Sequence, residues 1–535
     1  MKTHTVPVSL FVLLFVVFVG AVTRPANATE AIDADVVLKG GTLVDGSGKP
    51  GVVGDVAIRG ERVVAVGTFR LGMVPLVLDC QGLVVAPGFI DLHTHSDYQV
   101  VKARTRANVN YLTQGCTTVV TGNCGSGPID VGRYYRRIDA AGAGTNVGHL
   151  LPQGGLRNAV LGTANRKPTI AELQKMKQLA TKAMKDGAWG MSTGLIYVPS
   201  SYADTDELVE IAKVIAKYHG IYASHIRNEN VRLLAAVNEA LMIGRRAGLP
   251  VHISHFKSSG EDAWGLVRKA AKKIEQARRA GQHVTADQYP YIASSTSLDA
   301  TLIPTWARAG GRKALLARFD DPATAARIRK SMAGALKRKR DGAVLRIARY
   351  APRKEWVGKD LAAIAREQRT SPLAMAIQIS RHGGAAIVNF SMNEDDVRHV
   401  MRIPWVATAS DGRAYLPGAD RPHPRNYGTF PRKIGRYALR DHVLSLAAAI
   451  RSVTGLPADI LGLTDRGYLK TGNYADIVVF NPKKFIDVAT FDDPHQYAAG
   501  VEYVFVNGTP ALFHKTPTGA LAGRALRHRV SPSEK

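Results

Sequence analysis

The sequence predicts an α/β protein: a (β/α)8 TIM-like barrel inserted into a small β-sandwich domain that is built from both ends of the chain. Three observations predict this fold class. About eight apolar runs, mostly separated by helical patterns, occupy the middle of the chain, as in parallel βα units. Short alternating strands occur near both ends. A length of 535 residues and an apolar content of 45% suffice for a large barrel with an accessory domain.

The first element is a targeting segment. Lys2 and His4 precede an apolar run at residues 6–22, and the small residues Ala-Asn-Ala at 26–28 suit signal peptidase. We expect a signal peptide at 1–28, so that the mature protein is exported, periplasmic or extracellular, without a stable membrane anchor. An uncleaved anchor is the alternative, because the run is near the lower length of a spanning helix.

The two terminal β-regions come next. Short strands are predicted at residues 34–39, 56–59, 62–66 and 76–79, and again at 475–480 and 501–506, with glycine-rich turns between several of them. We expect residues 33–86 and 466–515 to build one small β-sandwich domain. The barrel then covers residues 87–465, and residues 516–535 form a C-terminal tail.

The barrel strands are predicted from apolar runs that each close on polar residues. The runs and the residues at their ends are 88–92 with His93 and His95, 117–121 with Cys124, 146–148 with His149, 189–191 with Ser192, 221–224 with His225, 251–254 with His255, 284–286 with Asp287, and 405–409 with Asp411. In such a barrel the active site lies where the strands end. The recurrence of ligand-type residues at these ends therefore predicts a site there.

The gap between the seventh and eighth runs, residues 296–395, is too long for one crossover helix. We expect it to contain an insertion, a basic and mostly helical lid beside the pocket.

The net charge of the chain restricts the class of binding partner only in part. The net charge of +27 attracts nucleic acid, an anionic envelope or a carboxylate substrate alike. The run Lys-Arg-Lys-Arg at 337–340 lies in a helical region without interleaved aromatics, which favours a solvated helix face over a nucleic-acid contact. We expect no nucleic-acid partner.

The candidate metal ligands are four histidines and a cysteine. His93 and His95 are two apart on a strand and so point to the same face, where they can bind one metal ion or flank two. His225 and His255 end neighbouring strands and would face inward. A lone histidine at such a position is more often a core residue, but two of them downstream of the His-x-His pair favour metal ligands.

Cys124 and Asp411 each leave alternatives open. Cys124 lies in a glycine-flanked loop and is a zinc ligand, a buried thiol or a nucleophile. With only three cysteines, Cys80, Cys116 and Cys124, a disulfide framework is excluded and at least one thiol is unpaired. Asp411 is either the residue of an Asp-Gly turn or a general base; the surrounding ligands favour the base.

The order His-x-His, Cys, His, His, Asp resembles the amidohydrolase superfamily, and longer stretches resemble its D-aminoacylase branch, the N-acyl-D-amino-acid deacylases. The matching stretches cover nearly all of the mature chain. They are 85–95 (VAPGFIDLHTH), 187–199 (GAWGMSTGLIYVP), 224–229 (SHIRNE), 251–257 (VHISHFK), 287–291 (DQYPY) and 423–432 (HPRNYGTFPR).

The resemblance implies a zinc-dependent hydrolase of N-acyl-D-amino acids, with a tightly held Zn²⁺ on Cys124, His225 and His255. His93 and His95 would form a second, weaker metal site. Asp411 would take a proton from the attacking water and return it to the departing amine. The products would be a carboxylate and a free D-amino acid.

The small-molecule N-acyl amino acid carries an α-carboxylate, which needs cationic partners. Lys257 and Arg425 are the candidates matched to the family, and Tyr289, Tyr291 and Ser295 are nearby in sequence; a role without substrate contact is the alternative for each.

Two segments depart from the family pattern, and two alternative functions stay open. In the family an arginine follows the histidine more closely, whereas here seven residues, 150–156, separate His149 from Arg157. Residues 413–418 also differ from the family pattern. The hydantoinase and dihydroorotase branches carry a lysine at the end of the fourth strand, whereas this chain has Met-Ser-Thr-Gly at 191–194. Another amidohydrolase activity, on D-dipeptides or cyclic amides, is one alternative, and a non-catalytic surface-binding relative is the other.

Overall fold

The structure is a computed structural model that describes Met1 and residues 31–528. The predicted signal peptide therefore lies, apart from Met1, outside the described residues, as does the end of the predicted tail. Among the described residues, no helix is both long enough and apolar enough to cross a membrane. The mixed α/β content that the sequence predicts is confirmed.

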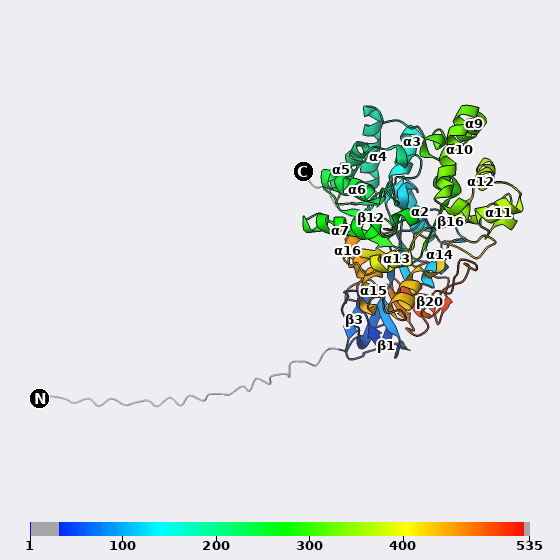
Figure 1. Cartoon of the computed structure of the whole chain (residues 1–535). Helices are drawn as coiled ribbons and strands as arrows, with labels where there is room; N and C mark the ends of the chain where they lie inside the picture. The colour runs from blue at the N-terminus through cyan, green and yellow to red at the C-terminus, as the bar shows by residue number, and fades with distance from the viewer. Residues whose placement is uncertain (2–30, 529–535) are drawn as a thin grey trace.

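Both ends of the chain contribute to one nine-stranded sheet, ordered β21-β20-β19-β18-β5-β1-β2-β3, in which β4 also pairs with β1. The blue N-terminal strands lie at the bottom of Figure 1, near β20. The strands are β1 (Val36–Leu43), β2 (Val52–Arg59), β3 (Arg62–Gly67), β4 (Leu76–Asp79), β5 (Val84–Pro87), β18 (Ile477–Phe480), β19 (Val501–Val506), β20 (Thr509–Phe513) and β21 (Thr516–Pro517). The sequence missed β5, β20 and β21, of which β21 falls in the segment predicted as the C-terminal tail; the two-layer sandwich stays a prediction.

The antiparallel pairing of β18 with β5 joins the two ends of the chain. β5 is buried along its whole length, and it leads directly into the parallel strands. The terminal sheet therefore holds the start of the central region in place.

Each of the eight predicted apolar runs contains a strand, and these strands, together with the additional short strand β9, pair in parallel. β6, β7 and β8 form one set, and β9-β10-β11-β12-β13-β17 form the other, with only Leu150 between β8 and β9. Their bounds are β6 (Phe89–Asp91), β7 (Cys116–Thr121), β8 (Asn146–His149), β9 (Leu151–Pro152), β10 (Gly190–Gly194), β11 (Ile221–His225), β12 (Val251–Ile253), β13 (Val284–Gln288) and β17 (Val406–Thr408).

Helices follow most of these strands. They are α1 (Val109–Leu112), α2 (Val131–Ala141), α3 (Gln153–Leu161), α4 (Ile170–Lys185), α5 (Thr205–Ala216), α6 (Leu233–Ala247), α7 (Leu266–Arg279), α13 (Glu394–Val400), α14 (Arg425–Pro431), α15 (Leu446–Val453) and α16 (Gly455–Leu461). At the start of α4, Thr169 and Glu172 form a reciprocal capping box, which provides hydrogen-bond partners for free backbone N–H groups.

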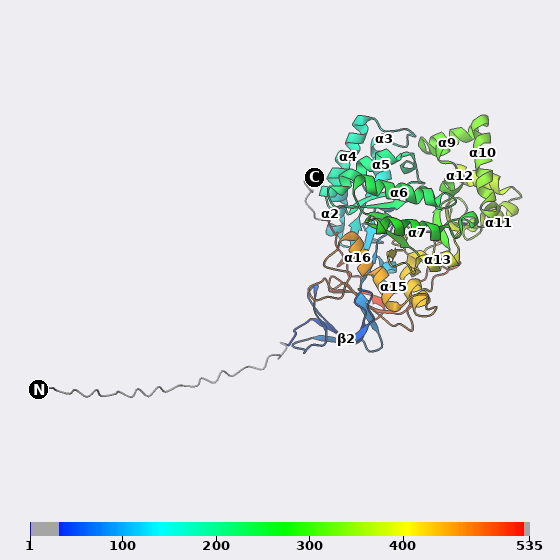
Figure 2. The ribbon, with the colours of Figure 1, turned by 60° about the vertical axis from the view of Figure 1, so that its left-hand side comes forward.

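The segment between β13 and β17 contains a subdomain with its own apolar core, which includes Phe319, Ile328 and Trp356. Figure 2 shows its helices α9 to α12 grouped on the side away from α2 and α4. Its elements are β14 (Ala293–Ser297), α8 (Leu298–Leu302), α9 (Gly311–Asp320), α10 (Pro322–Lys337), β15 (Leu345–Arg349), α11 (Leu361–Glu367), α12 (Pro372–Arg381) and β16 (Ala386–Phe390), the three strands pairing as β14-β16-β15.

Candidate metal centre and active site

A cavity of about 1370 Å³ lies between the carboxyl ends of the parallel strands and the inserted subdomain. Its walls include His95, Cys124, His225, His255 and Asp411. These residues come from five different strand ends, far apart in sequence, so the fold brings the predicted ligands to one place.

Three donor atoms converge at the centre of this cavity. The Sγ of Cys124 lies 3.6 Å from Nδ1 of His225 and 3.7 Å from Nε2 of His255, and these two nitrogens are 2.7 Å apart. All three residues are buried. A thiolate and two imidazoles so arranged match the ligand chemistry of zinc.

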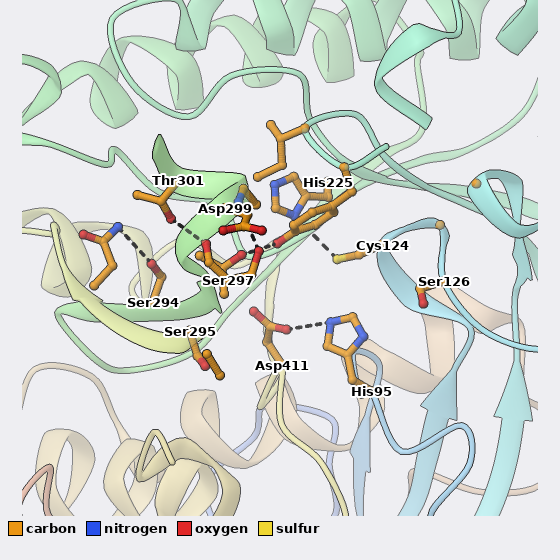
Figure 3. Close-up of a pocket in the computed structure, with 18 of the residues that line it drawn as sticks. His95, Cys124, Ser126, His225, Ser294, Ser295, Ser297, Asp299, Thr301 and Asp411 are labelled. Carbon is orange, nitrogen blue, oxygen red and sulfur yellow. Dashed lines mark hydrogen bonds and ion pairs between the residues drawn. The ribbon is translucent and has the colours of Figure 1, made fainter. Parts of the chain in front are cut away.

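His93 and His95 lie against the same group. The Nε2 of His93 is 3.3 Å from the Cys124 Sγ, and the Nε2 of His95 is 3.0 Å from Oδ1 of Asp411. Figure 3 shows the His95–Asp411 pair facing Cys124 and His225. Cys124 therefore belongs to two possible donor sets, one with His93 and His95, the other with His225 and His255.

The backbone is strained where three of these residues lie. Cys124, His255 and Asp411 have φ values of 51°, 36° and 49°, in the left-handed region that non-glycine residues adopt at a cost. Such strain persists only where surrounding contacts impose it, and it is common at functional sites. Here it turns each side chain sharply out of its strand end and into the cavity.

Two carboxylates that the sequence did not assign orient the histidines. Oδ2 of Asp287 lies 3.2 Å from Nδ1 of His93 and 2.9 Å from Nε2 of His252, and its Oδ1 accepts the backbone N–H of His255 at 2.7 Å. Oε1 of Glu229 lies 2.9 Å from Nδ1 of His255. A proton on each Nδ1 leaves the Nε2 lone pairs of His93 and His255 facing Cys124, as in a metal site.

The charges of the site favour a cation at its centre. Burial raises the pKa of the Cys124 thiol, but the charge of His93 and hydrogen bonds from His225 and His255 hold that pKa well below its usual value. Burial and the charge of Lys257 lower the pKa of His255, yet Glu229 and Cys124 raise it to about 9. A protonated imidazole or a metal ion supplies the positive charge that these anions require.

Asp411 is ionised in these surroundings. Burial opposes ionisation, but the charges of Arg425 and His93 and a hydrogen bond from His95 hold the pKa of its carboxyl well below the usual value. The Nη1 of Arg425 lies 2.8 Å from Oδ2 of Asp411. The carboxylate is thus available to accept a proton.

The predicted substrate-binding residues divide into two groups. Lys257, Arg425, Tyr289 and Ser295 line the cavity, and Ser295 is labelled in its wall in Figure 3. Tyr291 does not line it: its ring is 1% exposed and packs against His423 and Phe491. Tyr289 belongs to the same buried cluster and also contacts His423, but of the two tyrosines only Tyr289 reaches the cavity, so the prediction that Tyr291 contacts the substrate is wrong.

The sequence model of the amidohydrolase family matches residues 76–511. This chain belongs to the amidohydrolase family. Among relatives, the D-aminoacylase of Alcaligenes xylosoxydans xylosoxydans is 36% identical over 522 residues, which cover 92% of this chain and 97% of the relative. The N-acyl-D-glutamate deacylase of the same organism is 35% identical over 520 residues, with coverage of 93% and 97%.

A solved amidohydrolase structure also matches. The N-acyl-D-glutamate deacylase of Bordetella bronchiseptica, complexed with zinc and a phosphonate mimic of the tetrahedral intermediate, superposes with a TM-score of 0.80 at 32% identity. The match covers 93% of this chain and all of that one. The fold is therefore similar to that of this deacylase over most of the chain.

Proposed function

We propose that this amidohydrolase cleaves the amide bond of N-acyl-D-amino acids, giving a carboxylate and a free D-amino acid. The observation that carries the proposal is the convergence of Cys124, His225 and His255 beside an ionised Asp411, in a chain similar over almost its whole length to a D-aminoacylase. The enzyme is a hydrolase of linear amides.

The metal in this proposal is zinc, held tightly by Cys124, His225 and His255. When bound, it polarises the amide carbonyl and lowers the pKa of water. His93 and His95 make a second, weaker site, which shares Cys124. The fit rests on the donor set itself, since a thiolate and neutral imidazoles with carboxylates behind them are what zinc prefers.

Asp411 acts as the acid and base. Its Oδ1 faces His95, and Arg425 and His93 keep it ionised, so it accepts the proton of the attacking water and delivers it to the departing amine nitrogen. Lys257 and Arg425 bind the α-carboxylate, with Tyr289 and Ser295 beside them. D-specificity rests on the similarity to the deacylases.

We also propose that the parallel strands close as a (β/α)8 barrel at residues 87–465. Supporting this, Leu150 alone separates β8 from β9, Asp411 N–H donates to His93 O at 2.8 Å, His95 N–H donates to Gly412 O at 2.7 Å, and Thr94 bridges Gly412 in parallel. These contacts link the first strand end to the eighth. The terminal regions 33–86 and 466–515 then form the accessory β-domain, and the insertion within 296–395 acts as a lid.

Export remains a proposal from the sequence of residues 1–28. Sequencing the N-terminus of the protein recovered from its native host distinguishes cleavage after Ala28 from an uncleaved anchor.

The test of the function is amine release from paired N-acetyl-D- and N-acetyl-L-amino acids. The purified protein is assayed with zinc, after chelation, and as Asp411→Ala. We expect turnover of D-substrates alone, lost on chelation and in the variant. If neither enantiomer is cleaved while zinc is bound, the linear N-acyl assignment fails, and cyclic amides and dipeptides become the next panel.

A further inference from the structure

The subdomain wall of the cavity carries positive charge that the proposed reaction does not use. Lys339 and Arg349 from the subdomain and Arg413 from the loop after β17 all line this cavity, and within residues 31–528 no carboxylate oxygen lies within 4.0 Å of their charged nitrogens. The two cations already assigned to the α-carboxylate differ in this respect. Lys257 lies 2.5 Å from Glu229, and Arg425 lies 2.8 Å from Asp411.

Lys339 is the most enclosed of these three cations. It is half-buried, whereas Arg349 and Arg413 are exposed. Burial and the charge of Arg338 lower the pKa of Lys339, and Glu229, the carboxylate behind His255, is among the groups whose charge acts on it. Lys339 lines the same cavity as Glu229 and His255.

The chain holds Lys339 in this position. Helix α10 ends at Lys337, and Arg340 and Asp341 both adopt left-handed φ values, 47° and 49°. Arg340 forms an ion pair with Glu261, in the loop between β12 and α7. The basic run at 337–340 is thus more than the solvated helix face that its sequence predicts: Lys337, Arg338 and Arg340 are exposed, but Lys339 lines the cavity.

Two further carboxylates line the cavity, Asp299 and Asp420. Asp420 accepts the hydroxyl of Tyr415 at 2.5 Å and lies 3.2 Å from His495. Asp299, labelled in Figure 3, lies beside the charges of Arg312 and Arg308 inside the subdomain. Neither carboxylate pairs with Lys339.

The cavity is also large for its proposed substrate. At about 1370 Å³ it exceeds the range of about 300–1,000 Å³ typical of small-molecule sites, so it has room for a second functional group. Lys339 is half-buried and has no carboxylate within 4.0 Å among the described residues, so its ammonium group can bind an anion in the cavity.

We propose that Lys339 is a specificity-determining residue that binds a second carboxylate of the substrate, on its side chain or on its acyl group. This inference rests on the proposed deacylase function and narrows its substrate class to dicarboxylic N-acyl-D-amino acids. Arg349 and Arg413, on the same cavity, add to the attraction for a doubly charged anion.

The test compares matched pairs of substrates that differ by one charge. For the side-chain source the pair is N-acetyl-D-glutamate and N-acetyl-D-glutamine, and for the acyl source it is N-succinyl-D-alanine and N-butyryl-D-alanine. We expect kcat/KM to favour the charged member of one pair by about tenfold or more. The pair that shows the preference identifies the source of the second carboxylate.

Three variants assign the preference to Lys339. Lys339→Met should remove it through a raised KM for the charged substrate, with the neutral substrate unchanged, whereas Lys339→Arg should retain most of it. Lys337→Met, at an exposed position two residues earlier, is the matched control and should behave as the wild type. Calorimetry with the product amino acids D-glutamate and D-glutamine gives a readout that needs no turnover.

The outcomes separate the two proposals. If neutral and charged members of both pairs are cleaved equally well, or if Lys339→Met lowers both members of the preferred pair equally, the specificity inference is overturned and the deacylase function stands. If no N-acyl-D-amino acid is cleaved with zinc bound, the deacylase function itself fails and this inference fails with it.

Discussion

Asp287 connects three parts of the metal centre, so its replacement by asparagine tests how the site is organised. The carboxylate contacts Nδ1 of His93, Nε2 of His252 and the backbone N–H of His255, at 3.2, 2.9 and 2.7 Å. Asparagine has nearly the same shape but only one acceptor oxygen. That oxygen can keep the His255 backbone contact, while the amide NH₂ then faces the two imidazoles.

The expected magnitude follows from these contacts. Two hydrogen bonds to a charged group are lost, each worth about 1.5–3 kcal/mol, so Asp287→Asn should lower the free energy of unfolding by about 3–6 kcal/mol. Loss of the carboxylate behind a ligating histidine also weakens metal affinity or activity by about 10–100-fold. We expect the zinc affinity of Asp287→Asn to fall within that range.

The assay is a zinc titration against a chromophoric chelator, with urea unfolding of the metal-free protein measured in parallel. Asp206→Asn is the control, because Asp206 pairs with Arg246 on the surface at 2.8 Å, and such pairs contribute little. A zinc affinity and turnover for Asp287→Asn within twofold of the wild type would refute the role assigned to Asp287.

Three further predictions address the base, its arginine and a buried lysine. Asp411→Asn should lower kcat by about 10²–10⁴-fold with zinc content unchanged; a loss of zinc instead would make Asp411 a ligand. Arg425→Met should raise the pKa of Asp411, because Arg425 lowers it, so the acidic limb of the kcat/KM profile should move to higher pH; an unmoved limb contradicts this. Burial lowers the pKa of Lys433 to about 7, so between about pH 7 and 10 the unfolded chain binds one proton more than the folded chain. The free energy of unfolding should therefore rise with pH over this window. Denaturant unfolding at pH 6, 8 and 10 measures this rise, which should be smaller in Lys433→Met. The same pH dependence in the variant and the wild type would exclude Lys433 as its source.

The strand ends were predictable because apolar runs that close on polar residues are a local signal. His225, His255 and Asp411 could therefore be placed together from the order of residues along the chain. The short strand β5 was not predicted, since it has only four residues and a single residue, Gly88, separates it from β6.

The supporting residues were harder to predict, because their roles depend on contacts between distant segments. Asp287 closes a predicted strand and Glu229 lies four residues after His225, yet only the fold shows which imidazoles they contact. The same limit applies to Tyr291 and Lys339. The sequence shows that Tyr291 is aromatic and Lys339 basic. Whether each side chain reaches the cavity depends on the fold of the chain around Pro290 and after α10.

The central claim is that Cys124, His225 and His255 bind the metal ion on which D-specific deacylation depends. Titrating metal-free protein with zinc, while following both bound metal and hydrolysis of an N-acetyl-D-amino acid, tests it most directly. We predict that activity rises with the first equivalent of zinc and that Cys124→Ser loses both tight binding and turnover. Full activity in the metal-free protein, or tight zinc binding and wild-type turnover in Cys124→Ser, would contradict the account.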